Sequence, residues 1–271
     1  MGATIGRAMQ SDNSEPVLLR ALDGGVLRLT MNRPASRNAL SIALMEALRR
    51  ALDAAAATRE CRVVIISGAG PAFCAGHDLR ELRSDPSREL YERTFDECSK
   101  LMQQIVALPK PVIAEIHGIA TAAGCQLVAT CDLAIAAEEA RFATPGVNIG
   151  LFCSTPMVAL TRAVGRKPAM EMLLTGELID AATAKAIGLV NRVVPSAELS
   201  AATLELARQI AAKSAFTVAT GKEAFYRQAE MGLAEAYRYA GEVMTRNMLA
   251  QDAGEGIDAF LAKRVPVWQD A

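Results

Sequence analysis

Short runs rich in β-branched residues alternate with helical patterns through the first 195 residues, and this alternation constrains the fold more than any other feature. Strands are predicted at Val17–Leu22, Val26–Met31, Val63–Ser67, Val112–Ile116, Leu133–Ala136 and Leu189–Val194. Between them, Ser41–Ala56 and Arg88–Leu108 carry apolar residues at helical spacing. Strands alternating with helices form crossover units, so we expect an α/β core.

The pattern changes near Pro195, after which helical periodicity continues to the end of the chain. Helices are predicted at Leu199–Lys213, Phe216–Ala229, Leu233–Ala250 and Gly256–Lys263. We therefore expect two parts, an α/β core over residues 1–195 and a helical module over residues 196–271. The apolar share of 51% is sufficient for a core of this size and excludes disorder as the main state.

Charge and hydropathy exclude several classes of partner. Lys+Arg number 29 and Asp+Glu 30, a net charge of −1, which argues against a nucleic-acid-binding protein or a polybasic membrane-surface protein. Phe142–Thr161 is long enough to span a bilayer, but it contains Pro145, Gly146, Gly150 and Pro156. We expect buried loop and strand there, and no membrane span.

The N-terminus and the cysteines both suggest a chain in a reducing compartment. Residues 1–16 lack the apolar stretch of a signal peptide, so we expect a cytoplasmic location. The six cysteines form no CxxC pair and there are only two histidines, so we expect free buried thiols and no metal site.

Two glycine-bearing segments each follow a predicted strand and precede a helix. They run from Ser67 to Arg80 and from His117 to Val128. The first N–H groups of a helix have no partner within the helix and carry the positive end of its dipole, so each junction can bind an anionic oxygen. Neither segment matches a dinucleotide, P-loop or nucleophile-elbow motif. Spacing alone leaves open that both are only tight turns.

These two segments resemble the crotonase (enoyl-CoA hydratase/isomerase) superfamily, as do Asn32–Leu40, Phe142–Leu151, Thr175–Val190 and Glu255–Arg264. Within the superfamily the sequence is most similar to a subgroup called only enoyl-CoA hydratase domain-containing proteins. The resemblance implies a spiral of ββα units followed by a C-terminal helical trimerisation region. It also implies a homotrimer or a dimer of trimers.

The resemblance implies an acyl-CoA site in which two backbone N–H groups, those of His77 and Ala123, bind the thioester oxygen. The coenzyme A thioester is then substrate or ligand, and no separate cofactor is expected. The same resemblance places Arg37, Ala39, Ala75, Asp78, Leu79 and Arg80 at the CoA entrance. It places Gly124, Pro145, Leu151 and Ser154 beside the acyl group. Phe260 and Lys263 resemble residues that one subunit contributes to the CoA site of its neighbour.

The sequence departs from the superfamily where hydration chemistry is performed. The two glutamates that hold and activate water in that family correspond here to Gln126 and Gly146. Glutamine cannot take up a proton near neutral pH, and glycine has no side chain. Three functions stay open: an oxyanion-stabilising enzyme such as a malonyl-type decarboxylase or a thioesterase, a non-catalytic acyl-CoA binding protein, and a hydratase or isomerase that uses other groups.

Overall fold

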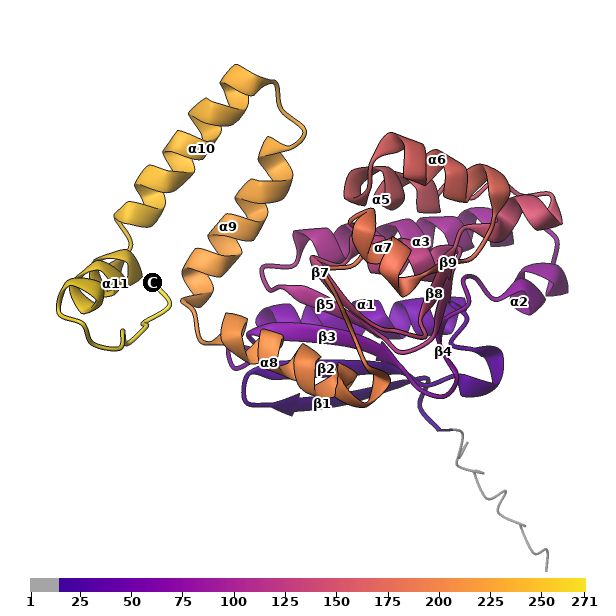
Figure 1. Ribbon diagram of the computed structural model, residues 1–271, viewed down its shortest axis with the longest axis horizontal. Coiled ribbons are helices and arrows are strands. Elements are labelled where there is room, and N and C mark those ends of the chain that lie inside the picture. The colour runs from indigo at the N-terminus through magenta and orange to yellow at the C-terminus, as the bar shows by residue number, and fades with distance from the viewer. Residues whose placement is uncertain (1–14) are drawn as a thin grey trace, which may run out of the picture.

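The computed structural model describes residues 15–271 (Figure 1). It contains two β-sheets, whose strands alternate along the chain and are connected by helices. The larger sheet has six strands in the order β1-β2-β3-β5-β7-β10, and the smaller has four in the order β4-β6-β8-β9. All pairs are parallel except β1–β2 and β8–β9. The N-terminal stretch on which the cytoplasmic expectation depends lies mostly outside the described residues.

The large sheet is formed by the strands that the sequence predicted. Its members are β1 (Leu18–Asp23), β2 (Val26–Met31), β3 (Val63–Gly68), β5 (Val112–Ile116), β7 (Leu133–Ala137) and β10 (Arg192–Val194). The side chains of β5 are all buried, as expected for a parallel strand covered on both faces. The last predicted strand is shorter than expected, because Leu189 and Val190 belong to the turn that precedes β10.

The strands of the small sheet were not predicted. They are β4 (Ala72–Cys74), β6 (Ile119–Thr121), β8 (Arg141–Ala143) and β9 (Ile179–Asp180). Segments of two or three residues are too short to show alternation, and only their pairing in the folded chain makes them strands.

Each strand of the large sheet from β3 to β7 is followed by a short strand of the small sheet and then by a helical segment, which gives a repeated ββα unit. The helices of the core are α1 (Ile42–Ala57), α2 (Leu79–Ser84), α3 (Arg88–Ala107), α4 (Ala123–Thr130), α5 (Pro156–Ala163), α6 (Arg166–Thr175) and α7 (Ala181–Ala186). Short 3-10 turns lie at η1 (Pro34–Ser36), η2 (Pro145–Ile149) and η3 (Ser196–Glu198). The α/β class and the spiral arrangement are as the sequence predicted.

The C-terminal part is helical as far as Leu261 and ends in a non-helical segment. Its helices are α8 (Leu199–Ala211), α9 (Ala215–Gln228), α10 (Leu233–Met248) and α11 (Gln251–Leu261). Helix α8 covers one face of the large sheet through Leu199, Leu206 and Ala207. Helices α9 to α11 extend away from the sheets, and α10 has no buried residue (Figure 1).

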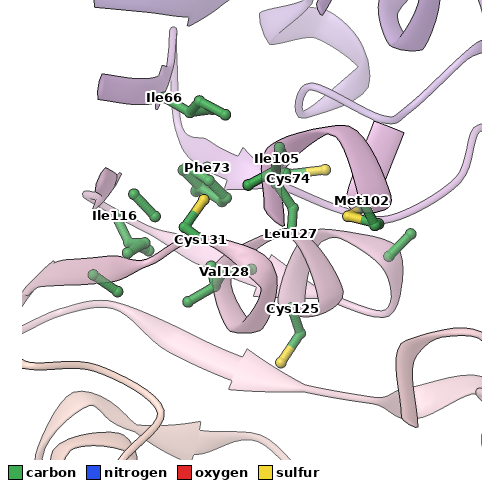
Figure 2. Close-up of a cluster of buried hydrophobic side chains, with 14 of the residues drawn as sticks. Ile66, Phe73, Cys74, Met102, Ile105, Ile116, Cys125, Leu127, Val128 and Cys131 are labelled. Atoms are coloured by element: carbon green, nitrogen blue, oxygen red, sulfur yellow. The ribbon is translucent and has the colours of Figure 1, made fainter. Parts of the chain in front are cut away.

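The main core fills the space between the two sheets and the helices that connect them. Figure 2 shows its centre, where Leu127 and Val128 of α4 lie among Phe73 and Cys74 of β4 and Met102 and Ile105 of α3. Helix α4 is therefore fixed by packing on several sides, and its N-terminus has a defined position.

The expectation that Phe142–Thr161 is buried loop and strand is wrong in its second half, where the chain is exposed from the end of η2 to Phe152 and residues 156–163 form helix α5. Ile149, Leu151 and Phe152 are 60%, 56% and 43% exposed. The chain leaves η2 through Gly150, which has a left-handed φ of 78°, and then crosses the surface before α5 begins. Within residues 15–271, none of the helices has the length and apolar character needed to cross a bilayer.

Candidate active site

The small sheet brings the ends of three ββα units together. Strands β4, β6 and β8 are parallel neighbours, so their carboxyl ends lie at one edge of the sheet. His77 follows β4 by three residues, Ala123 follows β6 by two, and Gly146 follows β8 by three. Three segments that the resemblance associates with one site thus meet through strand pairing.

The turn between β6 and α4 has an unusual backbone conformation. Ala122 has φ 50° and ψ −118°, which a non-glycine residue adopts at a cost of about 1–3 kcal/mol. A hydrogen bond from Ala122 N–H to the Ala143 carbonyl, 2.9 Å long, holds this conformation. The next N–H, that of Ala123, is the first of helix α4 and has no acceptor within the helix.

The turn after β4 is fixed from the opposite side by the segment that follows η1. Leu40 donates its N–H to Gly76 O at 2.7 Å and accepts from Asp78 N–H at 3.2 Å. His77 lies between Gly76 and Asp78 and is the residue paired with Leu40 in this parallel bridge. In a parallel pairing the N–H of that middle residue points away from the neighbouring strand, so His77 N–H faces away from Leu40. A Cβ on Gly76 would lie 3.4 Å from Ala123 N, which shows how closely the two turns approach.

Neither His77 N–H nor Ala123 N–H donates a hydrogen bond to another group of residues 15–271. Two unused donors on adjoining, rigidly held turns can bind one oxygen that gains negative charge during a reaction. The N-terminal end of the α4 dipole adds to this stabilisation.

Asn38 is a positioning residue that the sequence analysis did not identify. It is fully buried, and its Nδ2 donates to the carbonyls of Ala69 and Ala72, both at 2.8 Å, while its Oδ1 accepts from Arg33 N–H at 2.9 Å. It thereby ties the loop that carries Leu40 to the start of β4. Its left-handed φ of 53° is a conformation that asparagine tolerates, a signal visible only in the structure.

Gln126 lies one turn into α4 from Ala123 and is 4% exposed. Its Oε1 accepts a long hydrogen bond of 3.8 Å from the Cys98 thiol. Burial raises the pKa of the Cys98 thiol to about 12, so this pair contains no thiolate near neutral pH. The carboxamide can orient a ligand or a water molecule but cannot accept its proton.

At Gly146 the space of a side chain is filled by another part of the chain. A Cβ built there would lie 2.4 Å from the Leu151 carbonyl oxygen and 2.9 Å from the Cys153 sulfur. The second glutamate position is therefore closed as well as empty, and no side chain can enter without movement of the Leu151–Cys153 segment. The sequence showed only that the carboxylate is missing.

Asp78 is the nearest carboxylate in sequence to the donor pair, and it serves as a helix cap. Its Oδ1 accepts from the N–H groups of Arg80 and Glu81 at the start of α2, and its Oδ2 accepts from Arg33 at 2.8 Å. Burial works to raise the pKa of Asp78, but these hydrogen bonds outweigh it and hold the pKa below its usual value. A carboxylate held in this way is a weak base.

His77 is half-buried, and its two ring nitrogens are buried without a hydrogen-bond partner. The ring packs edge-to-face against Phe95, with 5.5 Å between centroids. Burial lowers the pKa of His77 to about 4, so the imidazole is neutral near pH 7.

Between about pH 6.5 and pH 4 the unfolded chain binds a proton at His77 and the folded chain does not. The free energy of unfolding should therefore fall as the pH is lowered through this window. We expect His77 to contribute a loss of about 2–3 kcal/mol between pH 7 and pH 4. Urea unfolding of wild type and His77→Leu at both pH values tests this, and the variant should lose less stability on acidification. Equal losses in the two proteins would contradict the assignment.

The other residues implied by the resemblance lie at three places. Arg37 and Ala39 lie in the segment that follows η1, and Ala75, Leu79 and Arg80 lie in or just after the turn that follows β4. Arg37, Leu79 and Arg80 are exposed, and Ala75 N–H donates to Arg37 O at 3.0 Å, which holds the two segments together. Pro145 begins η2, Leu151 and Ser154 follow it on the surface, and Gly124 lies in the first turn of α4. Phe260 and Lys263 are exposed in and just after α11, at the opposite end of the molecule from α2 (Figure 1).

A cavity of about 720 Å³ lies farther along α4, between α3, α4, α5 and α9. It does not include the donor pair, but Gln126 lines it and so connects the two regions. Its other walls are mainly apolar, among them Met102, Val106, Val128, Val158, Ala159, Leu189 and Phe225. A pocket of this volume and lining suits an apolar ligand or an apolar part of one.

All six cysteines are free and buried, as the sequence predicted. Burial raises the pKa of Cys74 and Cys125, the two that lie beside the glycine turns, to about 12. These thiols are poor nucleophiles. Residues 15–271 contain no group of three or more His, Cys, Asp or Glu side chains arranged to hold a metal ion.

Comparison with known proteins agrees with the fold and with the motifs. The sequence matches the enoyl-CoA hydratase/isomerase family over residues 22–271. It is 47% identical over 263 residues to the human enoyl-CoA hydratase domain-containing protein 3, mitochondrial, covering 97% of this chain and 86% of the relative. It is 37% identical over 242 residues to the 2,3-dehydroadipyl-CoA hydratase of Escherichia coli, covering 89% of this chain and 94% of that protein.

Two solved structures are also very similar. An enoyl-CoA hydratase from Mycobacterium smegmatis has a TM-score of 0.92 at 53% identity, with 94% of this chain and 99% of that chain covered. The human enoyl-CoA hydratase domain-containing protein 3 has a TM-score of 0.91 at 47% identity, with 93% and 100% covered.

One expectation from the sequence is contradicted. The similar proteins from Homo sapiens, Xenopus laevis and Mus musculus are all named mitochondrial, so the expected cytoplasmic location is wrong by this comparison. A secretory signal peptide is apolar whereas a mitochondrial leader is amphipathic, so the hydropathy of residues 1–16 is no argument for a cytoplasmic location.

The strand-end geometry, the matched family region and the solved structures agree, and the chain belongs to the enoyl-CoA hydratase/isomerase, or crotonase, family.

Proposed function

We propose that the chain is an acyl-CoA enzyme that stabilises a thioester oxyanion or enolate with the N–H groups of His77 and Ala123 and does not use the hydratase acid/base pair. The observation that carries the proposal is the pair of unused donors on two touching turns, one of them held by the strained Ala122. An arrangement that costs conformational energy to maintain is expected where a ligand uses it.

Reactions that require mainly oxyanion stabilisation are compatible with these side chains. In the decarboxylation of a malonyl-type thioester, the C–C bond to the carboxylate breaks and its electron pair moves into the thioester carbonyl, giving an enolate that water then protonates at carbon. Carbon dioxide leaves without the help of a base. Hydrolysis of the thioester is the other candidate, because its tetrahedral intermediate also carries a negative oxygen.

A non-catalytic acyl-CoA binding function is the second candidate. It is favoured by one specific observation, the closure of the Gly146 position by the Leu151 carbonyl, which leaves the site without a general base there. Incubation with enoyl-, malonyl- and saturated acyl-CoA esters, followed by mass spectrometry of the products, separates the two. Binding of CoA esters without any product would favour the second candidate.

We place the acyl chain in the cavity lined by Gln126. From Ala123 to Thr130, which lines the cavity, the rise along α4 is about 10 Å, a length comparable to that of an extended chain of roughly eight carbons. The apolar lining supports a substrate with an unsubstituted medium-length tail.

We expect Ala159→Phe, which fills this cavity from α5, to weaken binding of octanoyl-CoA about tenfold or more, with little effect on acetyl-CoA. Thr161→Phe is the matched control, since Thr161 is exposed on the same helix and does not line the cavity. Calorimetric titration of each protein with both esters gives the comparison. Equal weakening of octanoyl-CoA and acetyl-CoA binding would place the tail elsewhere.

We also propose a homotrimer or a dimer of trimers. Helix α10 exposes Leu233, Tyr237 and Met244 to 78%, 75% and 63%, at positions that share one face. Helix α11 lies at the opposite end of the molecule from α2, the helix that begins directly after the His77 turn (Figure 1). Phe260 and Lys263, in and just after α11, would therefore contact the CoA of a second copy rather than that of their own chain. A monomer in solution with full CoA affinity would contradict this proposal.

A further inference from the structure

The last eight residues, 264–271, form a segment that we call the C-terminal tail. It follows α11, turns back at Lys263, whose φ is 52°, and returns along that helix. The tail is not helical, but both its backbone and its side chains form hydrogen bonds with other parts of the chain.

Two acidic residues of α11 hold the tail against the helix. Glu255 binds Arg264 through both carboxylate oxygens, at 2.6 and 2.8 Å, and accepts from Val267 N–H at 2.7 Å. Asp252 is 1% exposed and accepts from the N–H groups of Gln269 and Asp270 at 2.6 and 3.0 Å. The tail and α11 therefore form one unit.

The end of the tail joins this unit to the rest of the subunit. Asp270 accepts from Arg62, next to β3, at 2.6 Å and from Ala215 N–H, at the start of α9, at 2.8 Å. Trp268 donates its indole N–H to Ala212 O at 2.9 Å, and its ring packs on Gly256 of α11. The tail thus links α11 to the α8–α9 junction and to the core at the same time.

The backbone conformation of Asp270 indicates that the hydrogen bonds from Arg62 and Ala215 fix the position of this residue. Its φ of 61° lies in the left-handed region, which costs free energy for a non-glycine residue. Arg62 is fixed in turn, because its second terminal nitrogen donates to Lys213 O at 2.6 Å. Burial acts to raise the pKa of Asp270, but the bonds from Ala215 and Arg62 hold the pKa below its usual value, so the carboxylate is charged near neutral pH.

The chain offers α11 little other support. Within its own subunit, among residues 15–271, α11 packs mainly on α10, a helix without a buried residue, and Phe260 and Leu261 at the end of α11 are 81% and 73% exposed. Without the tail, α11 would be held mainly by the end of an exposed helix.

We infer that the C-terminal tail is a latch that sets the position of α11 on its own subunit, with Arg62, Trp268 and Asp270 as positioning residues for the surface that carries Phe260 and Lys263. Where it concerns CoA, the inference rests on the proposed function, in which Phe260 and Lys263 of one subunit contact the CoA bound by a second copy.

The position of α11 is tested directly by amide hydrogen exchange on the full-length oligomer. In Asp270→Asn and in Trp268→Ala we expect the amides of residues 251–261 to exchange at least about tenfold faster, with α1 and α3 unchanged. Asp23→Asn is the matched control, since Asp23 forms only a long, exposed pair of 3.9 Å with Arg208 of α8. Wild-type protection of α11 in both tail variants would overturn the inference.

The action through Lys263 is tested by a double-mutant cycle on CoA affinity. We expect Asp270→Asn and Lys263→Met each to weaken CoA binding about tenfold, and the double variant to lose clearly less than the two effects combined, because a displaced α11 no longer presents Lys263. Additive losses would overturn the positioning role. If Lys263→Met leaves CoA affinity unchanged while the tail variants still expose α11, the latch is supported and the proposed contact of Lys263 with CoA is the part that fails.

Discussion

Gly124→Ala should destabilise the protein by about 3–5 kcal/mol and abolish tight acyl-CoA binding. A Cβ at this position would lie 2.1 Å from the Cys74 carbonyl oxygen and 2.8 Å from the carbonyl carbon. Both atoms are backbone at the end of β4, three residues before His77, so no side-chain rotation can relieve the clash. The two turns must separate, and a displacement of about 1 Å between the donors can cost on the order of 10²-fold in rate.

Gly221→Ala provides the matched control for this substitution. Gly221 lies within α9, and nothing is within 4 Å of the place where its Cβ would be. Alanine there should be neutral or should stabilise the protein by up to about 1 kcal/mol. Urea unfolding and acyl-CoA titration of both variants give the comparison, and near-wild-type behaviour of Gly124→Ala would show that the turns are not packed as described.

Restoring the two glutamates should not create a hydratase. A general acid or base contributes about 10²–10⁴-fold, so the wild type, which lacks both, should hydrate crotonyl-CoA at least about 10⁴-fold more slowly than a dedicated hydratase. The double variant Gln126→Glu, Gly146→Glu should remain close to the wild-type rate, because the Leu151 carbonyl occupies the space of the second side chain.

Gly146→Ala separates the steric reason from the chemical one. A single methyl group at this position meets the Leu151 oxygen at 2.4 Å, so we expect a loss of stability of about 2–4 kcal/mol without any change of charge. Gln126→Glu alone should fold, since glutamate is almost isosteric with glutamine. A double variant of wild-type stability that hydrates crotonyl-CoA would contradict this account of the closed position.

The large sheet and the long helices could be predicted from the sequence because their signals are local. Val63–Gly68 and Val112–Ile116 are rich in β-branched residues. Ser41 caps α1 by accepting from Leu44 N–H, as a serine before an apolar periodic segment predicts. The short strands β4, β6 and β8 have no such signal, and they are the elements that bring the candidate site together.

The site could be predicted only in part for a similar reason. The resemblance of the two glycine segments to a known family gave His77 and Ala123 as expected donors, but the strained φ of Ala122 and the buried hydrogen bonds of Asn38 exist only once the turns are paired. From the sequence, Gly146 meant only that a carboxylate is missing. The structure adds that the backbone at Leu151 lies so close to Gly146 that a side chain has no room. The exposure of Ile149 and Leu151 could not be foreseen, because an apolar stretch of sequence does not by itself distinguish a core segment from an exposed apolar surface.

The central claim, that His77 and Ala123 provide an oxyanion site without the hydratase acid/base pair, is tested most directly by the products formed from crotonyl-CoA and malonyl-CoA under the same conditions. Mass spectrometry of both reactions should show no appreciable 3-hydroxybutyryl-CoA, and should show either loss of carbon dioxide or of CoA from the malonyl ester or tight binding without turnover. Hydration of crotonyl-CoA at the rate of a dedicated hydratase would contradict the account.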